Sequence, residues 1–207
     1  MSDQSREARW EARFAATDTY VFGTKPNEFL ARSAALIPPG GSVLAVADGE
    51  GRNGVFLAGR GLDVHSVEVS AAAIAKARRL AADHGTALRW EQADLLRWTW
   101  PTAAYDAVAA IFVQFVSPEE RPRFFANLID CLKPGGLLLL EGYRPEQIAY
   151  GTGGPSDPAH CYTEPMLRQH FASLDIMSLE SYDAMIDEGA GHSGMSALID
   201  LVARKPG

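Results

Sequence analysis

The chain has 207 residues, of which 47% are apolar, and carries a formal net charge of −7. A chain of this length buries one substantial core, so we expect a single domain. It has no apolar run near the roughly 20 residues of a membrane span, and its charged first residues are unlike a secretory signal. We therefore expect a cytoplasmic protein with no membrane partner. The absence of a basic stripe argues against nucleic acid as the main partner and favours a small molecule.

Strands and helices alternate between residues 42 and 142. Short apolar runs predict strands at 42–47, 63–69, 88–92, 106–112 and 137–140. Helices are predicted between them at 55–58, 71–84 and 118–132. The last of these helices opens with a capping box that pairs Ser117 with Glu120. This alternation predicts an α/β fold with a parallel sheet.

The last third of the chain has a different pattern. A helix is predicted at 163–171, followed by two strand-like runs at 174–185 and 196–203. The glycine-rich segment DEGAGHSG joins the two runs. We therefore expect them to pair as an antiparallel hairpin at the edge of the sheet.

A glycine-rich loop follows the first predicted strand. Gly49-Glu-Gly51-Arg-Asn-Gly54 matches the G-x-G-x-x-G pattern of dinucleotide-binding proteins. The second strand ends at Glu68, whose carboxylate is suited to accept hydrogen bonds from both hydroxyls of a ribose. These two features fit NAD and S-adenosylmethionine equally well.

The spacing separates these two ligands. A dinucleotide site needs a helix directly after the third glycine and an acidic residue roughly 20 positions further on. Here Gly59 and Gly61 end the helix early, and Glu68 follows Gly54 by about 14 positions. The third glycine is therefore interpreted as incidental, and an NAD-dependent oxidoreductase is the less favoured alternative.

Several segments carry a family resemblance. They are VLAVADGEGRNGVFLAGRGLDVHSVEVSAAAIAKARRLA, ADLLRW, YDAVAAIF and LKPGGLLLLEGY. In order and spacing they resemble the motifs of class I S-adenosylmethionine-dependent methyltransferases. The form GEGRN, with YVFGTKPNEFL and EGAGHSG, resembles the small tellurite-resistance and thiopurine methyltransferase branch.

The resemblance implies a fold and an activity. The expected fold is Rossmann-like, a seven-stranded, mostly parallel sheet with an antiparallel C-terminal edge strand. The expected activity is methyl transfer from S-adenosyl-L-methionine to a small acceptor, with a soft sulfur, selenium or tellurium nucleophile as the best candidate. A module that binds the cofactor without turnover is the alternative.

The resemblance also implies a set of cofactor-binding residues, with Glu68 at the ribose and Asp94 at the adenine amino group. The full set is Ala47, Asp48, Gly49, Glu50, Gly51, Arg52, Asn53, Glu68, Val69, Asp94, Leu95 and Ile111. Two positions depart from the family pattern: Ala45 replaces an acidic residue, and Ala47 replaces a glycine. Alanine at 47 suits the loop if its φ is negative. Either Asp48 compensates for the missing acid or the affinity is lower.

Methyl transfer requires alignment and exclusion of water more than a fixed catalytic residue. Three candidates for a catalytic role remain, each with a structural alternative. His192 is either a general base or an exposed turn residue. Gln114 either meets the acceptor or satisfies a loop backbone. Tyr20, together with Phe22, either covers the cofactor or anchors an N-terminal helix.

We expect the chain to form one domain over residues 1–207. Residues 1–40 form an N-terminal helical or lid segment, 42–142 the cofactor-binding core, and 143–207 an acceptor-side loop, helix and C-terminal hairpin.

Arg52 either pairs with the methionine carboxylate or is solvated. No cluster has the spacing of metal ligands, so we expect no metal. We expect a monomer or weak homodimer.

Overall fold

A computed structural model describes residues 3–189 and 191–207, with side chains from residue 6 onward. Seven strands form one sheet in the order β3-β2-β1-β4-β5-β7-β6. Their bounds are β1 Ser42–Val46, β2 Asp63–Glu68, β3 Arg89–Gln92, β4 Tyr105–Ile111, β5 Leu132–Tyr143, β6 Asp175–Asp187 and β7 Ser193–Arg204. The pairs among β1 to β5 are parallel, whereas β7 is antiparallel to both of its neighbours. The expected seven-stranded α/β fold is confirmed.

The hairpin of β6 and β7 pairs as expected, and the structure adds the position of each strand. β7 lies between β5 and β6, so the antiparallel strand is interior and β6 forms the edge. Residues 196–203 of β7 are buried without interruption, as expected for a strand covered on both faces. Ala190, in the turn between these strands, lies outside the described residues.

The helices are α1 Asp3–Ala15, α2 Glu28–Ser33, α3 Arg52–Gly59, α4 Ala71–Asp83, α5 Arg121–Asp130, α6 Gln147–Tyr150 and α7 Glu164–His170, with short 3₁₀ turns η1 Ala34–Leu36 and η2 Pro158–His160. Three of them begin at a side-chain cap. Asn27, Ser70 and Thr163 accept hydrogen bonds from backbone N–H groups in the first turns of α2, α4 and α7. The starts of α4 and α7 lie where the sequence predicts them, within a residue, whereas α2 was not predicted.

Three predicted helix bounds are wrong. The capping box forms, because Ser117 N donates to Glu120 and Glu120 N donates to Ser117, but it encloses a turn and α5 begins at Arg121. The helix predicted to reach Leu132 ends at Asp130, because Leu132 already pairs with Tyr105 in the sheet. The helix after the glycine-rich loop begins at Arg52, three residues before the predicted start.

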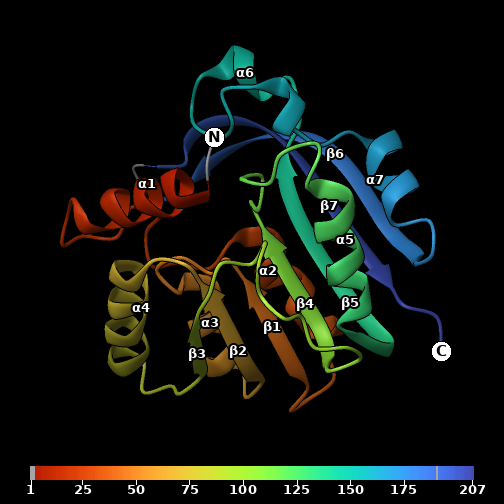
Figure 1. The fold of residues 1–207 in the computed structure, drawn as a ribbon, viewed down its shortest axis with the longest axis horizontal. Helices are drawn as coiled ribbons and strands as arrows, with labels where there is room; N and C mark the ends of the chain where they lie inside the picture. Colours follow the sequence, from red (N-terminus) through yellow and green to blue (C-terminus); the bar gives the residue numbers. More distant parts are fainter. Residues whose placement is uncertain (1–2, 190) are drawn as a thin grey trace.

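The sheet is covered on both faces (Figure 1). Phe29 and Leu30 of α2 and Leu57 of α3 pack against one face, while α5 and α7 pack against the other through a cluster that includes Phe125 and Phe171. The α1 helix lies above α4 in this view, at one end of the sheet. Two apolar layers of this kind are what a parallel sheet requires.

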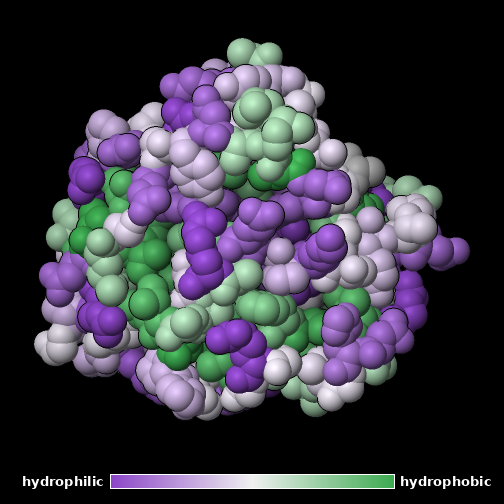
Figure 2. All heavy atoms as spheres, turned by 180° about the vertical axis from the view of Figure 1, so that it is seen from behind, coloured by the Kyte–Doolittle hydropathy of each residue, from purple (hydrophilic) through white to green (hydrophobic). Residues whose placement is uncertain are grey.

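The opposite face of the molecule shows polar side chains across its centre and apolar ones mainly to one side and below (Figure 2). Met185 is the most exposed large apolar side chain and sits on the edge strand β6. Within residues 3–189 and 191–207, no helix is long and apolar enough to cross a membrane.

Candidate active site

One cavity lies at the carboxyl ends of β1, β2 and β4, beneath α1. All the predicted cofactor-binding residues except Gly51 line it. The remaining lining residues are Arg6, Glu7, Trp10, Phe14, Phe22, Gly23, Ala93, Phe112, Phe115 and His192. The carboxyl ends of parallel strands are where ligands bind in open α/β sheets. The cavity is therefore the candidate active site.

The backbone of the first loop is left-handed at three positions. The φ angles are 49° at Ala47, 57° at Gly49 and 85° at Gly51. The condition under which alanine suits position 47, a negative φ, is therefore not met, and this conformation costs an alanine roughly 1–2 kcal/mol. Gly51 lies behind the cavity, where an added Cβ would stand 2.6 Å from the Cβ of Ala77. Its missing side chain lets α3 start against α4.

The third glycine has a structural role, which corrects its interpretation as incidental. Gly54 N donates to Asp48 Oδ1 at 3.1 Å, and a Cβ at this glycine would lie 2.3 Å from Asp48 Oδ2. Ser66 Oγ donates to the same carboxylate at 2.9 Å. Burial raises the pKa of Asp48 to about 7, although the hydrogen bonds from Ser66 and Gly54 act to lower it. Asp48 is thus a buried acid poised to change charge near neutral pH.

Glu68 is held firmly at the end of β2. Its carboxylate accepts hydrogen bonds from the N–H groups of Gly49, Val69 and Ser70, each at 2.9 Å. Burial nevertheless raises the pKa of Glu68, with these hydrogen bonds opposing the shift. A carboxylate offers about four acceptor positions, so one remains for a hydroxyl, and a second hydroxyl must displace a backbone donor.

Asp94 follows β3 and is more open than Asp48 and Glu68. Its Oδ1 accepts the N–H of Leu96 at 3.0 Å, and its side chain keeps 30% of its exposure. Leu95 beside it is buried. The pair therefore offers an apolar surface and a carboxylate with free acceptor capacity at the same end of the cavity.

Two predicted residues line the cavity but use their polar atoms elsewhere. Glu50 accepts hydrogen bonds from the N–H groups of Val21 and Phe22 and an ion pair from Lys76. Asn53 Oδ1 accepts the N–H of Asn27 at 2.9 Å. Their side chains therefore fasten the N-terminal segment to the first loop.

Arg52 is buried and not solvated, which removes one of its two alternatives. Its Nη2 donates to Glu188 at 2.7 Å, whereas its Nη1 is buried and has no hydrogen-bond partner. Burial opposes ionisation of Glu188, but His192 and Arg52 lower the pKa of this acid to about 2. Arg52 therefore keeps one unused donor beside the cavity.

His192 lines the cavity and is only 11% exposed at its side chain, so it is not an exposed turn residue. Its ring centroid lies 4.6 Å from those of Phe22 and Phe112 and 5.6 Å from that of Tyr143. Burial lowers the pKa of His192, as do the charges of Arg52 and Arg13. The imidazole is therefore neutral at pH 7.

The other two candidates do not reach the cavity. The Gln114 amide donates to the carbonyl groups of Tyr143 and His160 and accepts the N–H of Tyr143 at 2.6 Å. Tyr20 packs on α4 and donates from its hydroxyl to the carbonyl of Lys76 at 3.2 Å. Both side chains adopt the structural alternative, because buried backbone groups take up their polar atoms.

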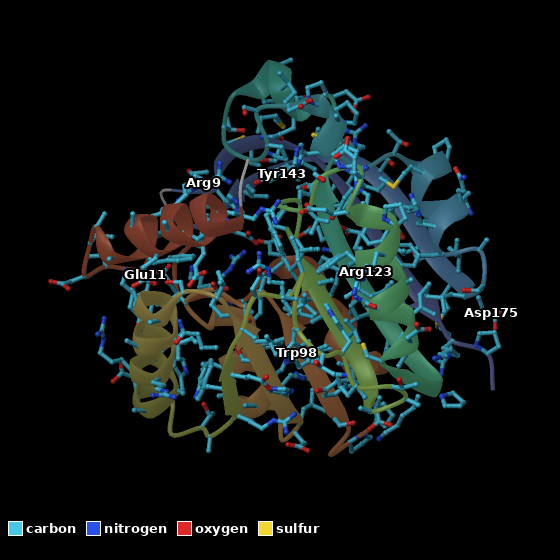
Figure 3. The ribbon with its side chains drawn as sticks, viewed as in Figure 1. Arg9, Glu11, Trp98, Arg123, Tyr143 and Asp175 are labelled. Atoms are coloured by element: carbon cyan, nitrogen blue, oxygen red, sulfur yellow. The ribbon has the colours of Figure 1, made fainter. Side chains whose placement is uncertain are left out.

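Sequence reasoning expected a lid from residues 1–40 but did not name the two aromatic residues that form the roof of the cavity. Trp10 and Phe14 stack at 5.6 Å on α1, and Phe14 is buried. Their spacing of four on a helix was the available signal. Figure 3 places Glu11 between α1 and α4, where it accepts a hydrogen bond from Ser70 Oγ at 2.6 Å. This contact fixes the roof over the strand ends.

No group of three or more His, Cys, Asp or Glu residues in the described parts of the chain is arranged to hold a metal ion. Cys131 and Cys161 are both buried and unpaired.

Comparisons with known proteins agree with this geometry. Residues 43–136 match the family described as methyltransferase domain. No curated protein matches the chain. One similar solved structure concerns the conversion of a disulfide bond into a thioacetal group during echinomycin biosynthesis. It has a TM-score of 0.80 at 17% identity, and the match covers 97% of this chain and 91% of that one.

Two further structures share the fold. The N-methyltransferase NodS from Bradyrhizobium japonicum WM9, in complex with S-adenosyl-l-homocysteine, has a TM-score of 0.73 at 16% identity, covering 98% and 99% of the two chains. TehB from Haemophilus influenzae has a TM-score of 0.70 at 18% identity, covering 95% of this chain and 67% of its own. Residues 43–136 thus match a methyltransferase domain, and the whole chain shares its fold with these solved structures.

Proposed function

We propose that the protein transfers a methyl group from S-adenosyl-L-methionine to a small acceptor with a soft sulfur, selenium or tellurium nucleophile. We place it in the tellurite-resistance and thiopurine-type branch on its sequence motifs. One observation carries the proposal: Asp94, Glu68, the loop 47–53 and His192 line a single cavity. The structure titled for chemistry at a disulfide bond, a sulfur centre, agrees with the acceptor class.

The sheet order supports the assignment of roles along the cavity. Asp94 follows β3, Glu68 ends β2, the loop follows β1 and Phe112 follows β4, and these strands are consecutive neighbours. Asp94 would hold the base and Glu68 the sugar. The remaining part of the cofactor then falls to Ala47 and Phe112, which places the acceptor near His192.

The charges of the cavity fit this cofactor. Asp48, Glu68 and Asp94 present carboxyl groups to a ligand that carries a sulfonium and an ammonium group. Asp48 is then the substitute for the acid that Ala45 replaces. The unused Nη1 of Arg52 is the partner for the methionine carboxylate.

The chemistry divides between the cofactor and the chain. When bound, S-adenosyl-L-methionine supplies an electrophilic methyl group, and its sulfur leaves as a neutral thioether. The rings of Phe22 and Phe112 exclude water from the acceptor. His192 would accept the proton of an acceptor X–H group, so that atom X is free to take the methyl group that the cofactor supplies.

The organisation of the chain follows from these roles. In this proposal α1 and the segment that follows it up to residue 40 cover the cavity, residues 42–142 hold the cofactor, and the segment from residue 143 onward supplies His192. Gln114 and Tyr20 have a structural role, because their side chains hydrogen-bond to backbone groups of neighbouring segments. A cytoplasmic monomer or weak homodimer remains part of the proposal, on the composition and charge of the sequence.

Calorimetry tests the cofactor assignment. Titration with S-adenosyl-L-methionine, its demethylated product and NAD is expected to show binding of the first two alone. A methyl-release assay then compares thiols, selenite- and tellurite-derived anions, and amines. Binding without turnover of any acceptor would favour the non-catalytic module, and binding of NAD in place of the others would overturn the proposal.

A further inference from the structure

Glu188 joins three segments of the chain that are far apart in sequence. Its Oε1 accepts from Asn27 Nδ2 at 2.9 Å, and its Oε2 accepts from Arg52 Nη2 at 2.7 Å. The same Oε2 lies 3.7 Å from His192 Nδ1, which is within ion-pair reach. Its side chain is only 8% exposed. A buried carboxylate so placed holds its neighbours in fixed positions.

The turn that carries Glu188 and His192 is closed by its own backbone. Glu188 N donates to His192 O at 2.8 Å, and His192 N donates to Gly189 O at 3.1 Å. Gly191 N donates in turn to Val21 O at 3.0 Å. The turn therefore cannot shift without breaking contacts to the N-terminal segment.

The imidazole has little freedom within this turn. The rings of Phe22, Phe112 and Tyr143 pack around it. Of these three residues, Tyr143 is labelled in Figure 3. Its Nδ1 is buried and makes no hydrogen bond, and Glu188 is the acid with which it is paired. Because the side chain still lines the cavity, its exposed edge is the one away from Nδ1.

Resting on the proposed function, we infer that Glu188 is a positioning residue, which holds the proton of neutral His192 on Nδ1 and leaves Nε2 free to accept the acceptor's proton. A carboxylate beside one ring nitrogen selects the tautomer in this way. The charged or titratable groups that face the imidazole are Glu188 from its own turn, Arg52 from α3, Arg13 from α1 and Tyr143 from β5. Of these, only Glu188 is an acid.

The tautomer is measured by ¹⁵N NMR on the intact protein labelled at histidine, at a pH where His192 is neutral. The wild type is expected to show Nδ1–H. Glu188→Gln is expected to shift His192 toward Nε2–H and to lower its pKa, because the negative charge that favours the protonated ring is lost. Glu188→Asp is expected to restore part of the Nδ1–H population.

Turnover provides the second readout, with thiophenol as the probe acceptor. Glu188→Gln is expected to lower kcat about 10- to 100-fold with less effect on the KM for the cofactor. The matched control is Glu119→Gln, which changes an exposed acid that does not line the cavity and leaves the tautomer unchanged.

The outcomes separate the two proposals. Nε2–H in the wild type, or Nδ1–H retained in Glu188→Gln, would overturn the role of Glu188 even if methyl transfer occurs. If the protein shows the expected tautomers but turns over no acceptor, the positioning role stands and the proposed function fails. If Glu188→Gln does not fold, the wild type and Glu188→Asp still decide the tautomer.

Discussion

Asp48→Asn tests the buried acid of the first loop. The amide keeps an oxygen for the N–H of Gly54, and its NH₂ group faces Ser66 Oγ, which is able to accept. The substitution therefore preserves both hydrogen bonds and removes only the charge. Any large change in stability must then come from the ionisation of Asp48.

The sign follows from the raised pKa. Burial raises the pKa of Asp48 from 3.8 to about 7, so the folded protein binds this proton more tightly than the unfolded chain. Stability falls as the pH rises from about 4 to 7, at about 1.4 kcal/mol per unit of pKa difference. The wild type thus loses about 4 kcal/mol above pH 7, and Asp48→Asn does not.

Urea unfolding at pH 4 and pH 8 measures this difference. Asp48→Asn is expected to match the wild type at pH 4 and to exceed it by about 4 kcal/mol at pH 8. Asp83→Asn, which removes the same charge from an exposed position on α4, is the control. Equal stabilities of Asp48→Asn and the wild type at pH 8 would refute the reasoning. The stabilised variant is expected to bind S-adenosyl-L-methionine more weakly, since it lacks the charge for the ammonium group.

Three further substitutions test neighbouring features. Glu68→Ala is expected to weaken cofactor binding by about 1–3 kcal/mol in calorimetry, and unchanged affinity would contradict the ribose assignment. Burial and the charge of Asp200 raise the pKa of Glu141 well above its usual value, so Glu141→Gln should gain stability over the wild type at pH 8 but not at pH 4 in urea titrations. A loss at pH 8 would reject this sign. Ala47→Gly relieves a left-handed alanine and should raise stability by up to about 1 kcal/mol, whereas destabilisation would show that the strain is absent.

The local pattern of the sequence was sufficient for the order of the seven strands and of helices α3, α4, α5 and α7, but not for α2 and α6. The spacing of apolar residues and the capping of helices are properties of short segments. This is why Ser70 and Thr163 predict the starts of α4 and α7. The parallel sheet followed from the alternation of these elements. The strand ends that line the cavity followed in turn, because a parallel sheet brings its carboxyl ends together.

The direction of each polar side chain depended on tertiary structure. Gln114 and Tyr20 have the chemistry of an active site, yet backbone groups from other segments take up their polar atoms. The positive φ of Ala47 likewise arises from the path that the chain must follow between β1 and α3.

The sequence by itself determined the fold class, the sheet and the loop that faces the cavity, because these depend on neighbours within a few positions. Only the tertiary structure decided that Glu188 meets Arg52 and His192, residues that come from α3 and from the β6–β7 turn. His192 is only four positions from Glu188, but Arg52 is 136 positions from it. No local pattern records such a distance, so both the pairing and the neutral charge of His192 appear only when the chain is folded.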